Sequence, residues 1–269
     1  HECAAVYAAI AYIRASGKPA VVVTTAGPGV GNTAAGMMDA QAFGVPLIHI
    51  GGAVKVSKRD AGDLQDMDTL ELMATCSKWA KKLTLKERIP EYISMAYRHA
   101  TDSRDPGPVY LEIPTDLVSG KIEEDDVIYP EKYTTDAIPF GDPQRIEKAA
   151  ELLAGAKRPA MLIDDGARFS MGNYADSVSD LSDYLKMPVG IIGNLCRGLF
   201  GNEAENPLLS VDMTPKADVV LALGCRFDWR IGMGSVISKD AKIIQVHTDS
   251  RMIGFNLGVD IGIIGGAGP

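Results

Sequence analysis

The sequence alternates short apolar runs with longer segments of helical period along almost its whole length, and this constrains its fold more than any other feature. Short β-branched runs are typical of buried parallel strands, and apolar residues three or four apart are typical of helices. The predicted strands are Ala20–Thr24, Val45–Gly51, Ser77–Leu83, Pro108–Ile113, Ala160–Ile163, Val189–Ile192, Asp218–Leu223, Lys242–Val246 and Val259–Ile264. The predicted helices are Glu2–Ser16, Asn32–Phe43 (capped by Asn32), Met67–Ala74, Lys86–Ala100, Arg145–Ala154 and Tyr174–Leu185. The alternation predicts an α/β fold with doubly wound, mainly parallel sheets.

One stretch interrupts the alternation and divides the chain. Residues 121–142 are acidic, rich in Pro and Tyr, and without clear periodicity. This stretch is longer than most connections inside a compact domain, so we interpret it as an interdomain linker. The sequence therefore predicts two successive domains, residues 1–120 and residues 143–269.

Composition excludes several classes of partner. The formal charge is −8 and the pI about 5.1, which argues against nucleic acid because phosphate backbones attract clustered Lys and Arg. No uninterrupted apolar run approaches the roughly 20 residues of a membrane-spanning helix, so no membrane partner is expected. The four cysteines form no Cys-x-x-Cys pair, which argues against a disulfide framework and a thiolate zinc site and favours a cytoplasmic location.

A glycine-rich turn follows the first predicted strand. Gly27, Gly29 and Gly31 alternate with other residues, a spacing that fits neither the dinucleotide fingerprint G-x-G-x-x-G nor a P-loop. Glycine at the end of a strand permits a positive φ and lets another group approach the backbone closely. The turn alone leaves two alternatives open: a tight strand-to-helix connection, or a place where a ligand meets the main chain.

The surrounding motifs carry a family resemblance that covers nearly the whole chain. "HECAAVYAAIAYIRASGK" and "TAGPGVGN" resemble the pyrimidine-binding domain of thiamine diphosphate-dependent enzymes, the group that includes acetolactate synthase, benzaldehyde lyase and the 2-hydroxyacyl-CoA lyases. "LQDMDTLELMATCSKWAKKL" is similar to the glutamine-containing loop of that domain and the strand after it, and "DPGPVYLEIPTDL" to its closing strand. "LGCRFDWRIGMG" is similar to a stretch of the central domain in acetolactate synthases and benzaldehyde lyase.

The resemblance implies a site around the glycine turn. Glu2 would hydrogen-bond the cofactor's aminopyrimidine and favour the tautomer that removes a proton from the thiazolium ring, with a pKa raised by an apolar wall that includes Ala4, Ala5 and Val6. Gln65 would reach the substrate, and Leu64 would line its pocket. The residues implied to hold the cofactor are Thr25, Gly27, Pro28, Gly29 and Asn32. The alternatives are that Glu2 is a first-turn acid that favours the helix dipole, and that Gln65 stabilises its loop.

The central domain leaves a similar choice. Relatives bind FAD or an adenine nucleotide there, and Gly166, Arg226 and Asp249 lie at loop ends where such a ligand would bind. Arg226 could instead pair with an acid, and Asp249 could cap a helix at Ser250–Ile253. Asp164 and Asp165 stand where FAD-bearing relatives have glycines. Their carboxylates would repel a pyrophosphate, so FAD is not expected.

The resemblance also implies what lies outside residues 1–269. The family holds Mg²⁺ and the diphosphate with a Gly-Asp-Gly segment and a later Asn in a C-terminal domain, and no such motif occurs here, so no metal ligand is expected in this chain. The first strand of the pyrimidine-binding domain is expected before His1. Because the family's cofactor lies between subunits, a homodimer or homotetramer is implied.

The implied activity is that of a thiamine diphosphate-dependent carbon–carbon lyase or carboligase. Its substrates would be 2-keto acids, 2-hydroxy ketones or aldehydes, in the manner of benzaldehyde lyase and acetolactate synthase. The alternatives are a 2-hydroxyacyl-CoA lyase, a 2-keto acid decarboxylase, and a non-catalytic nucleotide-binding module that keeps only the fold.

Overall fold

The chain forms two compact units, each with its own sheet. The computed structural model describes residues 1–135, 137–168, 170, 175–193, 196, 207–208 and 211–268. Unit 1 comprises residues 1–102 and 106–136, and unit 2 comprises residues 103–105 and 137–269. The domain boundaries expected from the sequence stay a prediction, and each unit is described by itself.

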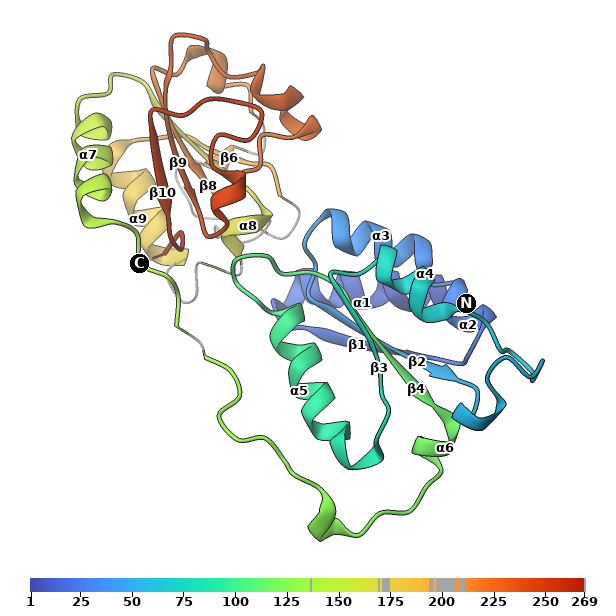
Figure 1. The fold of residues 1–269 in the computed structure, drawn as a ribbon. Coiled ribbons are helices and arrows are strands. Elements are labelled where there is room, and N and C mark those ends of the chain that lie inside the picture. Colours follow the sequence, from blue (N-terminus) through green and yellow to red (C-terminus); the bar gives the residue numbers. More distant parts are fainter. Residues whose placement is uncertain are drawn as a thin grey trace. The chain divides into compact units, whose positions relative to one another are not determined.

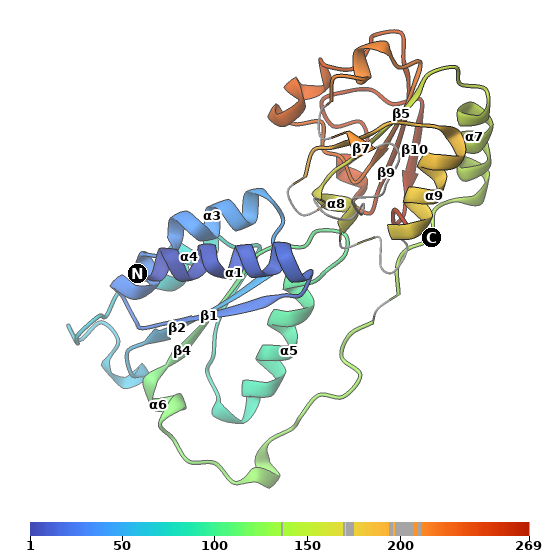
Figure 2. The same ribbon diagram turned by 180° about the vertical axis from the view of Figure 1, so that it is seen from behind.

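Unit 1 is an α/β layer structure around a parallel sheet (Figure 1). The sheet has the order β1-β2-β4-β3, and every pairing is parallel. Helices α1 and α3 cover one face and α5 covers the other, and the reverse view shows α1 lying along β1 (Figure 2). The elements are α1 (Glu2–Ser16), β1 (Ala20–Thr24), α2 (Pro28–Gly31), α3 (Ala34–Ala42), β2 (Leu47–Ala53), η1 (Val56–Lys58), α4 (Thr69–Thr75), β3 (Trp79–Lys82), η2 (Lys86–Arg88), α5 (Ile89–Ala100), β4 (Val109–Pro114), α6 (Thr115–Val118) and η3 (Glu124–Asp126).

Unit 2 has the strand order β10-β9-β8-β5-β6-β7, again with parallel pairings throughout. The chain starts in the middle at β5, winds outward to β7, then returns to β8 and winds the other way, which is the doubly wound topology. The elements are α7 (Pro143–Ala154), β5 (Pro159–Ile163), α8 (Asp165–Arg168), α9 (Ala175–Leu185), β6 (Val189–Ile191), β7 (Pro207–Leu208), η5 (Thr214–Lys216), β8 (Val219–Leu223), η6 (Trp229–Gly234), β9 (Lys242–His247), η7 (Ser250–Met252) and β10 (Ile261–Ile264).

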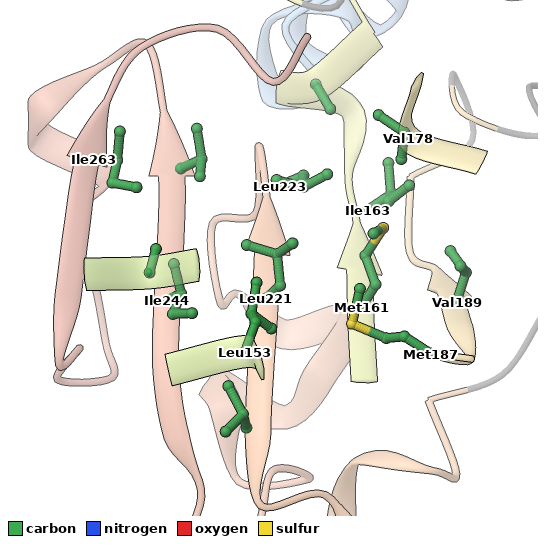
Figure 3. Packing of buried hydrophobic residues seen from close by; sticks show 14 of the residues in the cluster. Leu153, Met161, Ile163, Val178, Met187, Val189, Leu221, Leu223, Ile244 and Ile263 are labelled. Atoms are coloured by element: carbon green, nitrogen blue, oxygen red, sulfur yellow. The ribbon is translucent and has the colours of Figure 1, made fainter. Parts of the chain in front are cut away.

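The core of unit 2 follows from the alternation of side chains along its strands. Met161, Ile163 and Leu221 point to the face that α7 and α9 cover, and Figure 3 shows them packed with Leu153 and Val178 from those helices. The intervening residues, such as Leu162 and Val220, are buried on the opposite face. Both faces are therefore apolar, which explains why these strands read as continuous apolar runs.

The structure confirms the predicted fold class and corrects details. The helix predicted to begin at Asn32 begins at Ala34, because the short helix α2 precedes it and Asn32 is the C-cap of α2. Strand β1 was expected to be buried, yet Val21 and Val23 are 55% and 72% exposed, because β1 is an edge strand and α1 covers only its other face. Strand β7 was not predicted, and the helix start expected at Tyr174 lies outside the described residues.

Two further expectations concern covalent and membrane chemistry. Cys3, Cys76, Cys196 and Cys225 all have free thiols. In the described part of the chain, none of the helices combines the length and the apolar character that crossing a membrane would require.

Candidate active site at the glycine turn

The glycine turn connects β1 to α2 through a conformation that only glycine adopts easily. Gly27 has φ +59° and ψ −115°, and Pro28 then begins α2 with its fixed φ. A Cβ on Gly27 would lie 2.9 Å from the Cβ of Gln65 and 3.0 Å from its carbonyl oxygen. Gly27 therefore permits both the turn and the close approach of the loop that carries Gln65.

Glu2 and Asn32 meet directly at this turn. Glu2 begins α1 and Asn32 ends α2, and the Asn32 side-chain amide donates a hydrogen bond of 2.9 Å to Glu2 Oε2. The other carboxyl oxygen, Oε1, lies toward Gly29, since a Cβ built on Gly29 would be 3.6 Å from it. The same Cβ would lie 2.6 Å from the Thr25 methyl group. Gly29 thus lets the Thr25 methyl group pack against the turn backbone beside the Glu2 carboxyl.

The electrostatics of Glu2 differ from the sequence expectation. The predicted apolar wall was wrong, because Ala4 and Ala5 are exposed and Val6 packs against Gly36. The hydrogen bond from Asn32 lowers the pKa of Glu2 below its usual value, where a rise was predicted. The side chain is therefore a carboxylate at neutral pH in this structure.

Gln65 lies beside the same turn in a strained backbone conformation. Its φ is +67°, which is uncommon for a residue other than glycine, and the Thr25 hydroxyl donates a 3.4 Å hydrogen bond to its side-chain oxygen. Leu64 precedes it with 83% of its surface exposed. Such outliers cluster at functional sites because the surrounding structure must hold them in place.

The loop that carries Gln65 is held by an ion-pair cluster that the sequence analysis missed. Arg59 pairs with Asp66 at 3.4 Å and with Asp68, and it donates to the carbonyl of Met67 at 3.0 Å. Asp66 also accepts from the backbone N–H of Asp60 at 2.6 Å. The pattern of one arginine among four aspartates in ten residues was a signal for it in the sequence.

In unit 2, the edge of the sheet where β5 ends is occupied by charged side chains and by closely packed backbone. Asp164 follows β5 and is 2% exposed, and the Arg230 guanidinium binds both of its oxygens at 2.7 and 2.8 Å. Arg230 also contacts Asp165 at 3.4 Å and Asp228 at 2.8 Å. Burial raises the pKa of Asp164, and the charge of Arg230 opposes that rise. This arginine cluster was not predicted from the sequence.

The three candidate nucleotide residues of unit 2 make structural contacts. A Cβ on Gly166 would lie 2.6 Å from the carbonyl oxygen of Gly224, so Gly166 permits close packing of two turns. The Arg226 backbone N–H lies 3.4 Å from Asp164 Oδ2. The Asp249 side chain caps η7 by accepting from the Arg251 N–H at 2.9 Å, which confirms the expected cap. No group of three or more His, Cys, Asp or Glu that could hold a metal ion occurs among the residues with described positions.

Comparison with known proteins decides the family. The model of the thiamine pyrophosphate enzyme N-terminal TPP binding domain matches residues 1–72, and the model of the thiamine pyrophosphate enzyme central domain matches residues 146–269. The chain belongs to the thiamine pyrophosphate enzyme family. Thiamine pyrophosphate is the same compound as thiamine diphosphate, so the resemblance seen in the motifs is confirmed.

The chain is similar in sequence to curated proteins from several organisms. A probable acetolactate synthase large subunit from Methanocaldococcus jannaschii is 32% identical over 99% of this chain and 47% of the relative. The mitochondrial acetolactate synthase catalytic subunit of Saccharomyces cerevisiae is 32% identical over 86% of this chain and 36% of the relative. The human 2-hydroxyacyl-CoA lyase 2 is 29% identical over 92% of this chain and 44% of the relative. The chain spans about half the length of the first of these curated relatives.

Proposed function

We propose that this chain is the pyrimidine-binding and central part of a thiamine pyrophosphate-dependent enzyme that cleaves or forms carbon–carbon bonds next to a carbonyl group. One observation carries the proposal. The Glu2 carboxyl, held by the Asn32 amide, lies beside Gly29 and Thr25 at the glycine turn. A purely structural turn has no need of a carboxylate that is bound to the amide at the end of α2.

The residues at the turn fit the pyrimidine end of this cofactor. Gly29 lets the Thr25 methyl group lie close to the turn backbone near Glu2 Oε1, and Gly27 lets Gln65 approach the same turn. The carboxylate of Glu2 would accept a hydrogen bond from a ring nitrogen, and Thr25, Pro28 and the turn backbone would bound the ring. When bound, the cofactor supplies a thiazolium ring that acts as an electron sink.

Glu2 is the group through which the chain would control proton transfer. Its lowered pKa makes it an acceptor at neutral pH, and its link to Asn32 fixes which oxygen faces Gly29. An aromatic ring placed against the carboxylate would displace water and raise the pKa of Glu2 toward the range useful for exchanging a proton. Gln65 would orient the substrate carbonyl, and Leu64 would provide an apolar wall for the substrate's side chain.

The substrates proposed are 2-keto acids, 2-hydroxy ketones or aldehydes. Both kinds of relative, the acetolactate synthases and the 2-hydroxyacyl-CoA lyase, are compatible with a carbonyl acceptor, and a benzaldehyde lyase-like preference stays a prediction. The Mg²⁺ ligands are proposed to lie outside residues 1–269, in a cytoplasmic homodimer or homotetramer.

We also infer that the central domain binds no flavin. The edge where a dinucleotide pyrophosphate would lie is lined by Asp164 and Asp165, and the Arg230 guanidinium that pairs with them is shared with Asp228. Gly166 packs against Gly224, which leaves no glycine cradle between these two turns. The purified protein should be colourless, and a flavin absorption band would contradict this inference.

Calorimetric titration of the intact protein with thiamine pyrophosphate and Mg²⁺ tests the main proposal. We expect saturable binding that Gly29→Val weakens strongly, because a branched side chain would displace Thr25 and press toward the Glu2 carboxyl. Leu64→Ala is the control, since its exposed side chain lies outside the turn and should leave cofactor affinity unchanged. Absence of binding to the unmutated protein would favour the alternative of a non-catalytic module.

A further inference from the structure

His49 is a buried polar residue to which nothing in the proposed mechanism assigns a role. It lies in the middle of β2, has no exposed surface, and faces the side of the sheet that α1 and α3 cover. Its ring nitrogens lie 2.9 Å from the Thr24 hydroxyl and 3.4 Å from the Thr33 hydroxyl. Thr24 immediately precedes the segment 25–32 that carries the candidate cofactor residues, and Thr33 immediately follows it.

The contacts of Thr33 determine the tautomer of this histidine. The Thr33 hydroxyl donates to the carbonyl of Val30 at 2.6 Å, a stronger bond than its 3.7 Å approach to the Met73 sulfur. Because a hydroxyl has one hydrogen, Thr33 can only accept from His49, so Nδ1 carries the proton. Nε2 of the neutral ring must then accept from the Thr24 hydroxyl. One neutral tautomer therefore satisfies both threonines.

The surroundings favour that neutral ring. The ring of Tyr110 on β4 lies against His49 with 5.1 Å between the ring centroids. The Tyr110 hydroxyl donates to the Thr69 hydroxyl, which in turn donates to the buried carboxylate of Glu112. Glu112 in turn lies 3.5 Å from Lys82. Burial lowers the pKa of His49 to about 4, so the ring is uncharged at neutral pH.

We propose that His49 is a positioning residue that fixes the cofactor turn by holding Thr24 and Thr33 at its two ends. The inference rests on the proposed function for the identity of the ligand but not for the geometry of the turn. Inside the turn, the Gly31 N–H donates to the Gly27 carbonyl at 3.0 Å and the Asn32 N–H donates to the Pro28 carbonyl at 2.9 Å. His49 adds side-chain bonds from β2 to both ends of the turn, beside the ladder pairing of Thr24 with Gly51.

Two variants separate this role from simple packing. His49→Phe keeps an aromatic ring against Tyr110 but removes both hydrogen bonds. His49→Gln places an amide oxygen near the position of Nε2, so it can still accept from Thr24 and should rescue part of the effect. If His49→Phe fails to fold, Thr24→Val removes the bond to Nε2, and Thr33→Val removes the bond to Nδ1 together with the one to the Val30 carbonyl. Both variants keep the side-chain shape.

The experiment combines nitrogen NMR of the imidazole with amide hydrogen exchange in the intact protein. We expect a neutral ring protonated at Nδ1. We expect His49→Phe to reduce the exchange protection of the Gly31 and Asn32 amides roughly tenfold and to weaken thiamine pyrophosphate binding by a similar factor. His49→Gln should give intermediate values of both. Amides of α5, which covers the opposite face, should not change.

The outcomes distinguish this inference from the proposed function. Ring protonation at Nε2, or unchanged turn protection in His49→Phe and in both valine variants, would overturn the positioning role. If the unmutated protein binds no thiamine pyrophosphate, the proposed function fails, while the tautomer and the exchange data still decide whether His49 holds the turn.

Discussion

The two units each place glycines where parallel strands end, and these glycines have different neighbours. In unit 1, Gly27 lets Gln65 approach the turn, and Gly29 lets the Thr25 methyl group pack beside Glu2. In unit 2, a Cβ on Gly224 would lie 2.0 Å from the Ala167 N–H nitrogen, and Gly166 packs against Gly224 in return. The first pair brings side chains of the candidate site to one turn, and the second lets two segments of backbone touch.

The difference teaches that a glycine at a strand end does not identify a ligand site by itself. What distinguishes unit 1 is the chemistry beside the glycines: the Glu2 carboxylate accepts from the Asn32 amide through one oxygen, and its other oxygen lies toward Gly29. At the edge of unit 2, the carboxylates of Asp164, Asp165 and Asp228 converge on Arg230. We therefore assign cofactor chemistry to unit 1 and a stabilising role to the arginine cluster of unit 2.

The largest effect should come from removing Asp164. Asp164→Ala removes the carboxylate that both terminal nitrogens of the largely buried Arg230 guanidinium bind, and breaking a buried ion pair costs about 3 kcal/mol or more of unfolding free energy. Urea denaturation of unit 2 measures the loss, with the exposed Asp240→Ala as a control expected to stay within about 0.5 kcal/mol. A strong loss of cofactor affinity in Asp164→Ala, without unfolding, would break the comparison by making the edge of unit 2 part of the site.

Acid should weaken both units alike, because each buries a histidine on a strand of its sheet, His49 on β2 and His247 on β9. Burial lowers the pKa of His49 to about 4 and that of His247 to about 4. The unfolded chain binds these protons near pH 6.5, so stability is full above that pH and is lost as the pH falls toward 4. Each histidine should cost about 2 kcal/mol between pH 7 and pH 5.

Urea denaturation at several pH values measures this loss, and His49→Phe should remove the contribution of unit 1 only. If the variant keeps the full pH dependence, His49 titrates normally in the folded state and is not buried as described.

Part of this comparison could be predicted from the sequence. The strand runs and the Gly17 cap of α1 with φ +69° follow from local patterns, and the meeting of Glu2, Gly29 and Gln65 at one turn follows from the family resemblance. The arginine cluster around Arg230 and the His49 contacts could not, because they join residues 16 to 66 positions apart that no quoted motif links. The pKa of Glu2 was predicted in the wrong direction because an apolar wall was expected beside it and the hydrogen bond from Asn32 was not.

A smaller effect is expected when alanine replaces either of two glycines of the turn, because Gly29→Ala and Gly31→Ala should differ in cofactor affinity. Gly29→Ala brings a methyl group to 2.6 Å from the Thr25 side chain and toward Glu2, whereas a Cβ on Gly31 would have no atom within 4 Å. Overpacking of this kind should weaken thiamine pyrophosphate binding about tenfold in Gly29→Ala. Gly31→Ala should leave affinity unchanged and stabilise the protein by up to about 1 kcal/mol. Calorimetry on both variants checks this, and equal affinities would mean that Gly29 borders no ligand.

The smallest effect on stability is expected at Leu64. Its side chain is 83% exposed, so Leu64→Ala should change the free energy of unfolding by less than about 0.5 kcal/mol. If Leu64 lines the substrate pocket, the variant should alter the ratio of kcat/KM between a small and a bulky aldehyde. A loss of stability without a change in preference would reassign Leu64 to a packing role within unit 1.

The most direct test of the account is the exchange of the thiazolium proton with deuterated water, followed by quenched-flow NMR on the cofactor bound to the intact enzyme. Glu2→Gln keeps the side-chain shape and a hydrogen-bonding group for Asn32 but removes the carboxylate. Glu71→Gln is the matched control, an exposed first-turn acid on α4 of the same unit. The account predicts that Glu2→Gln slows exchange by ~10²–10⁴-fold, the usual contribution of a positioned acid–base group, while Glu71→Gln exchanges at the unmutated rate. Exchange at the unmutated rate in Glu2→Gln would contradict the account and leave Glu2 as an acid that only favours the start of its helix.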